Sequence, residues 1–508
     1  MTHDFDIAVV GGGINGAAVA RDAAGRGLRV FLAERDDYAA ATSSTSSKLI
    51  HGGLRYLEQF NVRLVRESLR ERQILLANAP HLVWPLRFLM PLYADSPRPA
   101  WMVRLGLGLY DGLSFGDGLE ASGALGSDEV AGLPYLRRSG LGRVLHYADC
   151  WGNDARLVVE LLMDARAHGA DVGNYRDVNS VRPVPDGWRV AYTYASGRQE
   201  ITARFVVNAA GPWVNDILER VRGVPAKRSV RLVRGSHIVV EMPFDEGALG
   251  LVDRVAWTLQ GSDRRVIFML PWLGGRFLII GTTEIVEEGD PAEAYCSEEE
   301  RDYLLGMSNY FFRWPHGDMG AGDIVSSWSG VRPLLDDGRA EVRTVSRDYR
   351  FEVERNGRGG LVSVYGGKLT THRALAEKLM KVLGRMGLEV GESWTARGVF
   401  PGGELARVAL EEEAACVPEG VASGVWRRWC FTYGSRARAV LGAGPLGEIA
   451  EGVPEAELCY AWAQEGVKRA DDFLNRRTRM ALTLSDTGRG AVEAWFGDTS
   501  AADKNVVR

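Results

Sequence analysis

The sequence predicts an α/β fold that begins with a βαβ unit, continues into a separate mixed sheet and ends in helices. Three observations predict this fold. A glycine-rich turn joins a strand-like segment to a helical one near the N-terminus, strand-like segments recur in the middle of the chain, and only helical patterns follow about Pro401. The 508 residues are enough for two or three structural units with a large buried core.

The first βαβ unit lies within the first 34 residues. Residues 6–10 read as a short buried strand, residues 14–24 as an alanine-rich helix, and residues 29–33 as the next strand. Gly25 and Gly27 end the helix, and Glu34 closes the second strand. This order predicts two parallel strands joined by a crossover helix.

The turn between the first strand and the helix carries the pattern G-x-G-x-x-G. Gly11 permits a tight turn, Gly13 lets backbone amides approach a pyrophosphate, and Gly16 lets the helix pack against the strand. The helix N-terminus attracts phosphate, and Glu34 can accept hydrogen bonds from a ribose diol. The pattern therefore predicts a dinucleotide rather than an empty turn, but it does not separate NAD from FAD.

The later elements follow from periodicity and from turn residues. Residues 61–77 form a charged amphipathic helix, and the five prolines within 80–99 end it. Residues 157–167 and 374–386 are also helical. Strands are expected at 188–194 and 200–207, and in a separate middle sheet at 237–241, 266–270 and 277–280.

Composition excludes several classes of protein. The formal net charge is −5, which gives no reason to expect nucleic-acid binding. The five cysteines form no C-x-x-C pair, so we expect no metal and a reducing compartment. The N-terminus lacks a signal-peptide layout, and no apolar run of 18 residues occurs. These observations predict a cytoplasmic protein and leave peripheral membrane binding open.

A second unusual segment favours FAD over NAD. Six consecutive hydroxyl residues at 42–47 precede Lys48, His51, the glycine pair 52–53, Arg55 and Tyr56. Hydroxyls and amides there can bind the pyrophosphate and the flavin edge, and the glycines leave room for a flat ring. A disordered serine-rich linker is the alternative, but it does not explain the residues that follow.

Together with these segments, a series of short motifs gives the chain a family resemblance. They lie at 79–82, 147–150, 154–157, 208–213, 235–240, 271–272, 281–283, 329–333, 366–371, 469–472 and 476–479. In this order the sequence resembles the FAD-dependent glycerol-3-phosphate dehydrogenases, the respiratory flavoenzymes. The resemblance covers nearly the whole chain. A tyrosine usual in this family is replaced by His372, and a tryptophan by Gly466.

The resemblance implies a division into three domains. An FAD-binding, Rossmann-like domain of the amino-acid-oxidase type would comprise residues 1–75, 145–230 and 326–390. A substrate or cap domain with a mixed sheet would comprise 76–144 and 231–325, and an all-helical C-terminal domain would comprise 391–508.

The resemblance also implies a set of cofactor-binding residues in the two glycine turns, the hydroxyl-rich segment and the strand ends between them. They are Gly11, Gly13, Ile14, Asn15, Gly16, Glu34, Arg35, Thr42, Ser43, Ser44, Ser47, Lys48, Leu49, His51, Gly52, Val178, Ala210, Gly211, Trp213, Gly330, Arg332, Gly367, Lys368, Leu369 and Thr370. The turn at 366–371 opens a helix whose N-terminus would stabilise an anionic reduced flavin.

The implied substrate, glycerol 3-phosphate, carries a dianionic phosphate that requires fixed cations. Arginine suits phosphate through its two-pronged guanidinium. The candidates are Arg55, Arg332, Arg347 and Lys368, with Tyr56, His237 and Thr282 as further polar contacts. Arg332 is the first choice, because it stands in Ser-Gly-Val-Arg-Pro and not on a charged helix.

The implied reaction is a hydride transfer from C2 to FAD that yields dihydroxyacetone phosphate. A histidine is the simplest base for the C2 hydroxyl near pH 7. His51 is the first candidate and His237 the second; either could instead be structural. A cationic His237 or Arg332 could polarise the C2 oxygen without acting as base.

The resemblance further implies a membrane quinone as electron acceptor, peripheral contact with the inner face of the cytoplasmic membrane and a homodimer. Residues 84–115 are rich in Trp, Leu, Met and Pro and could dock at a membrane, or form a buried region under the cap. Arg476, Arg477 and Arg479 could touch lipid or the dimer partner, or be solvated.

Two alternative functions stay open at this stage. One is an oxidase that uses oxygen and releases hydrogen peroxide, although the insertion typical of such relatives is missing here. The other is a regulatory dinucleotide-binding protein without catalytic activity, which would leave the histidines and the cations unexplained.

Overall fold

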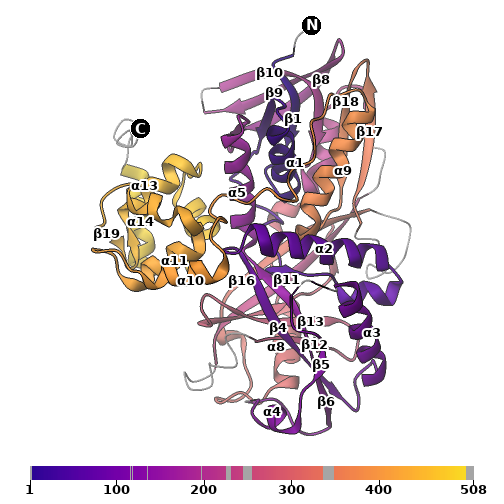
Figure 1. Ribbon diagram of the computed structural model, residues 1–508, viewed down its shortest axis with the longest axis vertical. Helices are drawn as coiled ribbons and strands as arrows, with labels where there is room; N and C mark the ends of the chain where they lie inside the picture. Colours follow the sequence, from indigo (N-terminus) through magenta and orange to yellow (C-terminus); the bar gives the residue numbers. More distant parts are fainter. Residues whose placement is uncertain are drawn as a thin grey trace.

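The computed structural model describes residues 3–114, 116, 118–133, 135–195, 197–224, 230–243, 255–335 and 348–498. Figure 1 shows three bodies: an upper sheet with its helices, a lower sheet, and a helical body beside them that contains the C-terminal region. The upper sheet contains the N-terminal βαβ unit. The lower sheet contains the strands from the middle of the chain.

The upper sheet is built around strand β1 (Phe5–Val10), which is parallel to both of its neighbours, β2 (Val30–Ala33) and β10 (Gly197–Asn208). Next to β10 lies β18 (Gly359–Tyr365), also parallel. The sheet is completed by β7 (Asp171–Gly173), β17 (Arg350–Asn356), β8 (Asp177–Val184) and β9 (Gly187–Tyr194).

Both faces of β1 are buried, as expected for a central parallel strand. Ile7 and Val9 pack in the core formed with α1 (Ile14–Gly25), α5 (Asp154–Ala167) and α9 (His372–Arg385). Ala8 and Val10 point the other way, into a core with β8, β9 and α6 (Val214–Glu219). The alternation places the end of β1 and the start of α1 at one edge of the sheet.

The lower sheet has ten strands and is mixed. Its order is β15–β11–β14–β13–β12–β4–β6–β3, with β16 paired to β11 and β5 paired to β6. The bounds are β3 (Leu49–Ile50), β4 (Val83–Tyr93), β5 (Gly123–Ala124), β6 (Leu141–Gly152), β11 (Val230–Glu241), β12 (Val255–Gln260), β13 (Val266–Trp272), β14 (Phe277–Gly281), β15 (Ile285–Val286) and β16 (Ile324–Leu335).

Helices lie on both faces of the lower sheet. One face packs against α8 (Glu298–Phe311). The other packs against the 3₁₀ segment η1 (Leu54–Gln59), α2 (Val62–Asn78) and α3 (Ala100–Leu113). The short helix α4 (Ser127–Ala131) lies between β5 and β6 in the chain. The predicted middle sheet is therefore confirmed.

Strands β3 and β16 join the lower sheet, although they fall in the segments predicted for the FAD-binding domain. Each strand adjoins a loop that lies at the junction of the two sheets. The sequence motifs identify the loop as part of the cofactor site, but only the backbone pairing shows that the strand belongs to the lower sheet. The division into domains otherwise stays a prediction.

Most predicted helices are confirmed within two or three residues. The helix expected at 61–77 is α2, where Asn61 caps the N-terminus by accepting the Leu64 amide at 3.3 Å. The prolines after it do end the helix, but β4 follows, with Pro85 and Pro91 inside the strand. Both prolines lie outside the stretch 87–89, which alone pairs with β12 as well as β6.

The C-terminal region is helical but not entirely so. It contains α10 (Arg407–Ala415), α11 (Ser423–Tyr433), α12 (Ala437–Leu441), α13 (Glu455–Gln464) and α14 (Asp486–Asp498). A two-stranded ribbon of β19 (Glu448–Ala450) and β20 (Val453–Pro454) corrects the expectation that no strand follows residue 401.

Buried ion pairs join the C-terminal region to the upper body. The Arg477 guanidinium donates to both oxygens of Asp37, at 2.7 and 2.8 Å. Arg476 also binds Asp37, at 2.6 Å, and Arg479 binds Asp154 at 2.9 Å. The expectation that these arginines face lipid, a partner or solvent is wrong, since their charges are neutralised inside the molecule.

Candidate functional site

Two neighbouring hollows lie where the two sheets meet. The smaller, about 140 Å³, lies at the ends of β1, β2 and β10, and the larger, about 980 Å³, extends over the lower sheet. Their walls share six residues: Ile14, Thr42, Ser43, Pro333, Gly366 and Gly367. The start of α1 therefore borders both hollows.

The first glycine turn has the geometry that its sequence predicts. Gly11 has φ +110°, and a Cβ there would lie 2.6 Å from the Ala209 carbonyl oxygen. A Cβ on Gly16 would lie 2.0 Å from the Gly11 carbonyl oxygen. Both positions therefore require glycine. The prediction that Gly16 lets α1 pack closely against β1 is therefore confirmed.

Glu34 lies in the wall of the smaller hollow with its carboxylate fixed. It accepts the Gly12 amide at 2.6 Å and the Asp36 amide at 2.9 Å. Burial is the main influence on its pKa, which is raised. Nearby, the Arg35 guanidinium lies 4.0 Å from the Trp213 ring centre, so both predicted residues border the same hollow.

The start of α1 faces the junction of the two hollows. The N-cap, Gly13, offers no side chain, and the Ile14 amide donates to Ser43 Oγ at 3.0 Å. The hydroxyl-rich segment thus crosses the helix N-terminus, where phosphate is electrostatically favoured. This arrangement fits a pyrophosphate.

The second glycine turn meets the first through one side chain. Asn15 Nδ2 donates to the Gly366 carbonyl at 3.0 Å, and a Cβ on Gly367 would lie 2.7 Å from that nitrogen. Asn15 Oδ1 is buried and accepts no hydrogen bond from any residue within the described ranges. A buried acceptor beside two backbone turns fits a ligand with ring N–H groups, as a flavin has.

Most of the predicted cofactor residues line one of the two hollows. Four lie behind the walls: Gly16, Ser44, Lys48 and Gly52. Lys48 Nζ donates to Asp154 and to the Ser44 carbonyl, both at 2.7 Å, and burial lowers its pKa to about 7. We therefore interpret Ser44 and Lys48 as supports of the hydroxyl-rich segment.

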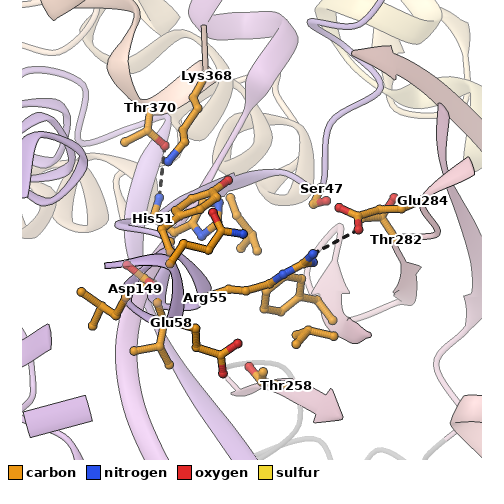
Figure 2. Close-up of a pocket in the computed structure, with 18 of the residues that line it drawn as sticks. Ser47, His51, Arg55, Glu58, Asp149, Thr258, Thr282, Glu284, Lys368 and Thr370 are labelled. Atoms are coloured by element: carbon orange, nitrogen blue, oxygen red, sulfur yellow. Dashed lines mark hydrogen bonds and ion pairs between the residues drawn. The ribbon is translucent and has the colours of Figure 1, made fainter. Parts of the chain in front are cut away.

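The larger cavity has a cationic end. Arg55 from η1, Arg332 from β16 and Lys368 from the second glycine turn all line it. Arg55 Nη2 lies 3.2 Å from Glu284 Oε2, and Figure 2 shows the Arg55 side chain reaching toward that carboxylate. Arg332 Nη2 donates to Thr282 Oγ1 at 3.4 Å.

Lys368 is held against Tyr56. Its Nζ lies 3.8 Å from the tyrosine ring centre, a cation–π contact, and 3.5 Å from Ser68 Oγ. Three cations from segments far apart in the chain therefore line the same cavity. Arg347, the fourth predicted cation, lies outside the described residues.

The two candidate histidines lie at different depths. His51 lines the cavity directly after β3, and its amide donates to Thr370 Oγ1 at 3.3 Å (Figure 2). His237, on β11, lies behind Ser47: its Nε2 is 2.8 Å from Ser47 Oγ, and its ring stacks on Trp328 at 5.2 Å. Burial and the nearby Arg332 hold the pKa of His237 well below its usual value.

A buried network fixes the backbone next to His51. The Gly52 amide donates to the Tyr110 hydroxyl at 2.8 Å, and that hydroxyl donates to Asp149 at 2.7 Å. Arg72 Nη1 binds the same carboxylate at 2.5 Å. Sequence reasoning missed these three residues, because they become partners only through the packing of α2, α3 and β6.

The other end of the larger cavity is apolar. Trp101, Met102, Leu105 and Leu109 follow one face of α3 and are exposed, with Trp101 and Leu105 both 68% exposed. Phe60 is 90% exposed at the end of η1. We call these five residues the apolar mouth; all five line the cavity.

The opposite face of α3 is also apolar. Val103, Leu107 and Tyr110 are buried against the lower sheet. Apolar side chains therefore occupy both faces of α3. Residues 84–115 were expected either to dock at a membrane or to be buried under the cap. Most of β4 and one face of α3 are buried, whereas the other face of α3 is exposed.

Comparisons with known proteins give a consistent result. A family model described as FAD dependent oxidoreductase matches residues 6–373, and one described as the C-terminal domain of alpha-glycerophosphate oxidase matches 362–496. A D-erythritol 1-phosphate dehydrogenase of Brucella abortus is 42% identical over 97% of this chain and 98% of its own.

Two further relatives and one solved structure are similar over nearly their full length. A glycerol-3-phosphate dehydrogenase of Pseudomonas aeruginosa is 43% identical, covering 96% of this chain and 93% of its own. An aerobic glycerol-3-phosphate dehydrogenase of Escherichia coli is 39% identical, covering 97% of both. The structure of a glycerol-3-phosphate dehydrogenase from Bacillus halodurans complexed with FAD has a TM-score of 0.75 at 29% identity, covering 98% of this chain and 92% of its own.

Proposed function

This chain belongs to the FAD-dependent oxidoreductase family, and from that premise we propose that it oxidises sn-glycerol 3-phosphate to dihydroxyacetone phosphate and passes the electrons to a membrane quinone. The observation that carries the proposal is that Arg55, Arg332 and Lys368, from three separate segments, all line the cavity that the two glycine turns border. Three cations fit a dianionic phosphate on a small molecule.

The phosphate binds among these cations. Arg332 contributes a guanidinium already oriented by Thr282, and Lys368 contributes an ammonium oriented by Tyr56. Arg347 remains a proposed fourth contact. Because the three described cations are anchored before substrate arrives, little side-chain entropy is lost on binding.

Bound FAD supplies the hydride acceptor, and the chain supplies positioning and proton handling. His51 accepts the C2 hydroxyl proton, because its ring borders the cavity and its backbone is held from both sides by Thr370 and, through Gly52, by Tyr110. His237 acts through Ser47: a neutral ring can accept the Ser47 proton and orient that hydroxyl toward the cavity. His237 is therefore our second choice as base, with Ser47 as the relay.

The apolar mouth is where we place contact with the membrane and access for the quinone. A tryptophan, a methionine and two leucines on one exposed helix face are typical of an interfacial helix. No helix within the described ranges is long and apolar enough to cross a bilayer. We propose peripheral contact with the inner face of the cytoplasmic membrane, and a homodimer that sedimentation would test.

The acceptor is tested by reoxidation. Enzyme reduced by substrate without oxygen is mixed with a soluble quinone analogue or with oxygenated buffer. We expect fast reoxidation by the quinone and slow reoxidation by oxygen. Rapid hydrogen peroxide formation would favour the oxidase alternative and contradict the quinone assignment.

A second candidate substrate is D-erythritol 1-phosphate, since a relative with that activity in its name is 42% identical to this chain. It carries the same phosphate with one more carbon and hydroxyl. Comparing kcat/KM for the two substrates decides between them.

A further inference from the structure

One carboxylate lies among the cations of the cavity. Glu284 follows β14, lines the cavity, and has a side chain only 8% exposed. Its Oε2 is 3.2 Å from Arg55 Nη2, and its Oε1 is 3.8 Å from Arg332 Nη1. The motif at 281–283 predicts a polar substrate contact at Thr282, and Glu284 follows directly after this motif.

A carboxylate is a poor neighbour for a phosphate. An ionised glutamate only accepts hydrogen bonds and repels a dianion, so at a site built for phosphate alone it would weaken binding. Hydroxyl groups, in contrast, donate to carboxylates in strong, charge-assisted hydrogen bonds. Glu284 therefore suits the part of a substrate that carries hydroxyls.

Lys368 is the cation that lies apart from Glu284 (Figure 2). Lys368 and Thr370 lie on the same side as His51, whereas Glu284 and Thr282 lie across from them (Figure 2). Arg55 contacts Glu284 through Nη2 and Arg332 through Nη1, and each guanidinium carries five N–H donors in all.

We propose that Glu284 is a specificity-determining residue that accepts a hydrogen bond from the terminal, non-reacting hydroxyl of a polyol phosphate and disfavours anions that lack it. In glycerol 3-phosphate this is the C1 hydroxyl, which stays unchanged while C2 is oxidised. The inference rests on the proposed function and adds to it the recognition of the end opposite the phosphate.

The test compares two substrates in the wild type and in variants of Glu284 and Glu58. The substrates are glycerol 3-phosphate and 2-hydroxypropyl phosphate, which lacks only the terminal hydroxyl. Each is mixed with the holoenzyme without oxygen, and the reduction of FAD is followed. For the wild type we expect a preference for glycerol 3-phosphate of about 10- to 100-fold in the apparent second-order rate of reduction, the value of one charge-assisted hydrogen bond. In Glu284→Ala the preference should fall to within about threefold.

Inorganic phosphate separates recognition from simple positioning of the arginines. As a competitive inhibitor, it should bind Glu284→Gln several-fold more tightly than the wild type, since the repulsion is removed. If Glu284 only holds Arg55 and Arg332 in place, the variants will weaken phosphate and both substrates in parallel, and the substrate preference will persist. That result overturns the inference.

Glu58→Gln is the matched control. Glu58 also lines the cavity and also pairs with an arginine, but its partner is Arg98, whereas Glu284 pairs with Arg55 and Arg332. The Glu58→Gln variant should prefer glycerol 3-phosphate as strongly as the wild type does. If it loses as much of this preference as the Glu284 variants do, the overall charge of the cavity, and not Glu284, determines specificity. If neither substrate reduces the wild-type flavin, the proposed function fails as well, which distinguishes that outcome from failure of the inference alone.

Discussion

The two ends of the larger cavity differ in how their side chains are held. At the cationic end, Arg55, Arg332 and Lys368 are fixed by Glu284, Thr282 and Tyr56. At the apolar mouth, the five side chains project from η1 and one face of α3 into solvent. The first end has the order that binding a small anion requires, and the second has the exposed apolar area that a lipid or quinone requires.

This difference predicts that the two ends serve different half-reactions. Substitutions at the cationic end should slow the reduction of FAD by substrate. Substitutions at the mouth should slow transfer to a quinone and leave reduction by substrate unchanged.

Arg332→Ala should lower kcat/KM for glycerol 3-phosphate by about three orders of magnitude. Loss of one buried charged contact costs about 2–5 kcal/mol. The measurement is anaerobic flavin reduction against substrate concentration. Arg265→Ala is the control, because Arg265 borders the same cavity but pairs with Asp263; its effect should stay within about threefold. Equal losses in both variants would contradict a defined phosphate site.

His51→Ala should slow flavin reduction by about 100-fold or more and change substrate affinity little, because a general base contributes about 10²–10⁴ to a rate. Stopped-flow reduction at saturating substrate measures the effect. If the rate is unchanged, the role of base passes to His237 through Ser47.

Ser47→Ala and His237→Gln sharpen the comparison of the two histidines. If His237 acts only through Ser47, both variants should slow reduction by similar factors, and the double variant should be no slower than either single one. Additive effects would show that His237 acts by another route.

Paired substitution of Trp101 and Leu105 by serine should reduce binding to anionic phospholipid vesicles and turnover with a membrane quinone by about tenfold or more. Burial of each side chain is worth about 1.5–3 kcal/mol. Flavin reduction by substrate should stay within about twofold. Val408→Ser, at an exposed apolar site on α10, is the control. An equal loss in the control, or a loss of flavin reduction, would remove the mouth from this role.

The smallest expected effect concerns pH and stability beneath the cationic end. Burial lowers the pKa of His372, at the start of α9, to about 4 from an ordinary 6.5. The unfolded chain therefore binds a proton that the folded chain excludes, so stability should fall as pH decreases from 6.5 toward 4, by up to about 1.4 kcal/mol per pH unit. His372→Asn should reduce this slope in urea unfolding. An unchanged slope would assign it to other groups, His237 first.

The sequence was most informative where chemistry is local. The steric demand at Gly16 depends on Gly11, a near neighbour in the chain, and the structure has this close approach as predicted. The cofactor hollow could be inferred because its walls are such turns.

Contacts between residues far apart in the chain could not be predicted from sequence patterns. Glu284 becomes meaningful only when η1 and β16 approach it, and Arg477 was assigned to the surface because its partner Asp37 is 440 positions away. His237 stands in a strand whose depth depends on which loop covers it, here the one with Ser47. Charge and hydroxyl content identify candidate residues, but tertiary packing decides which ones face the ligand.

Anaerobic addition of glycerol 3-phosphate to the FAD-loaded protein, without membrane or quinone, isolates the reduction of FAD by substrate from its reoxidation. We expect the oxidised flavin absorbance to bleach within the mixing time or shortly after, because the cationic end and His51 complete this half-reaction without the apolar mouth. A flavin that stays oxidised with glycerol 3-phosphate, or that bleaches only when vesicles are added, would contradict it.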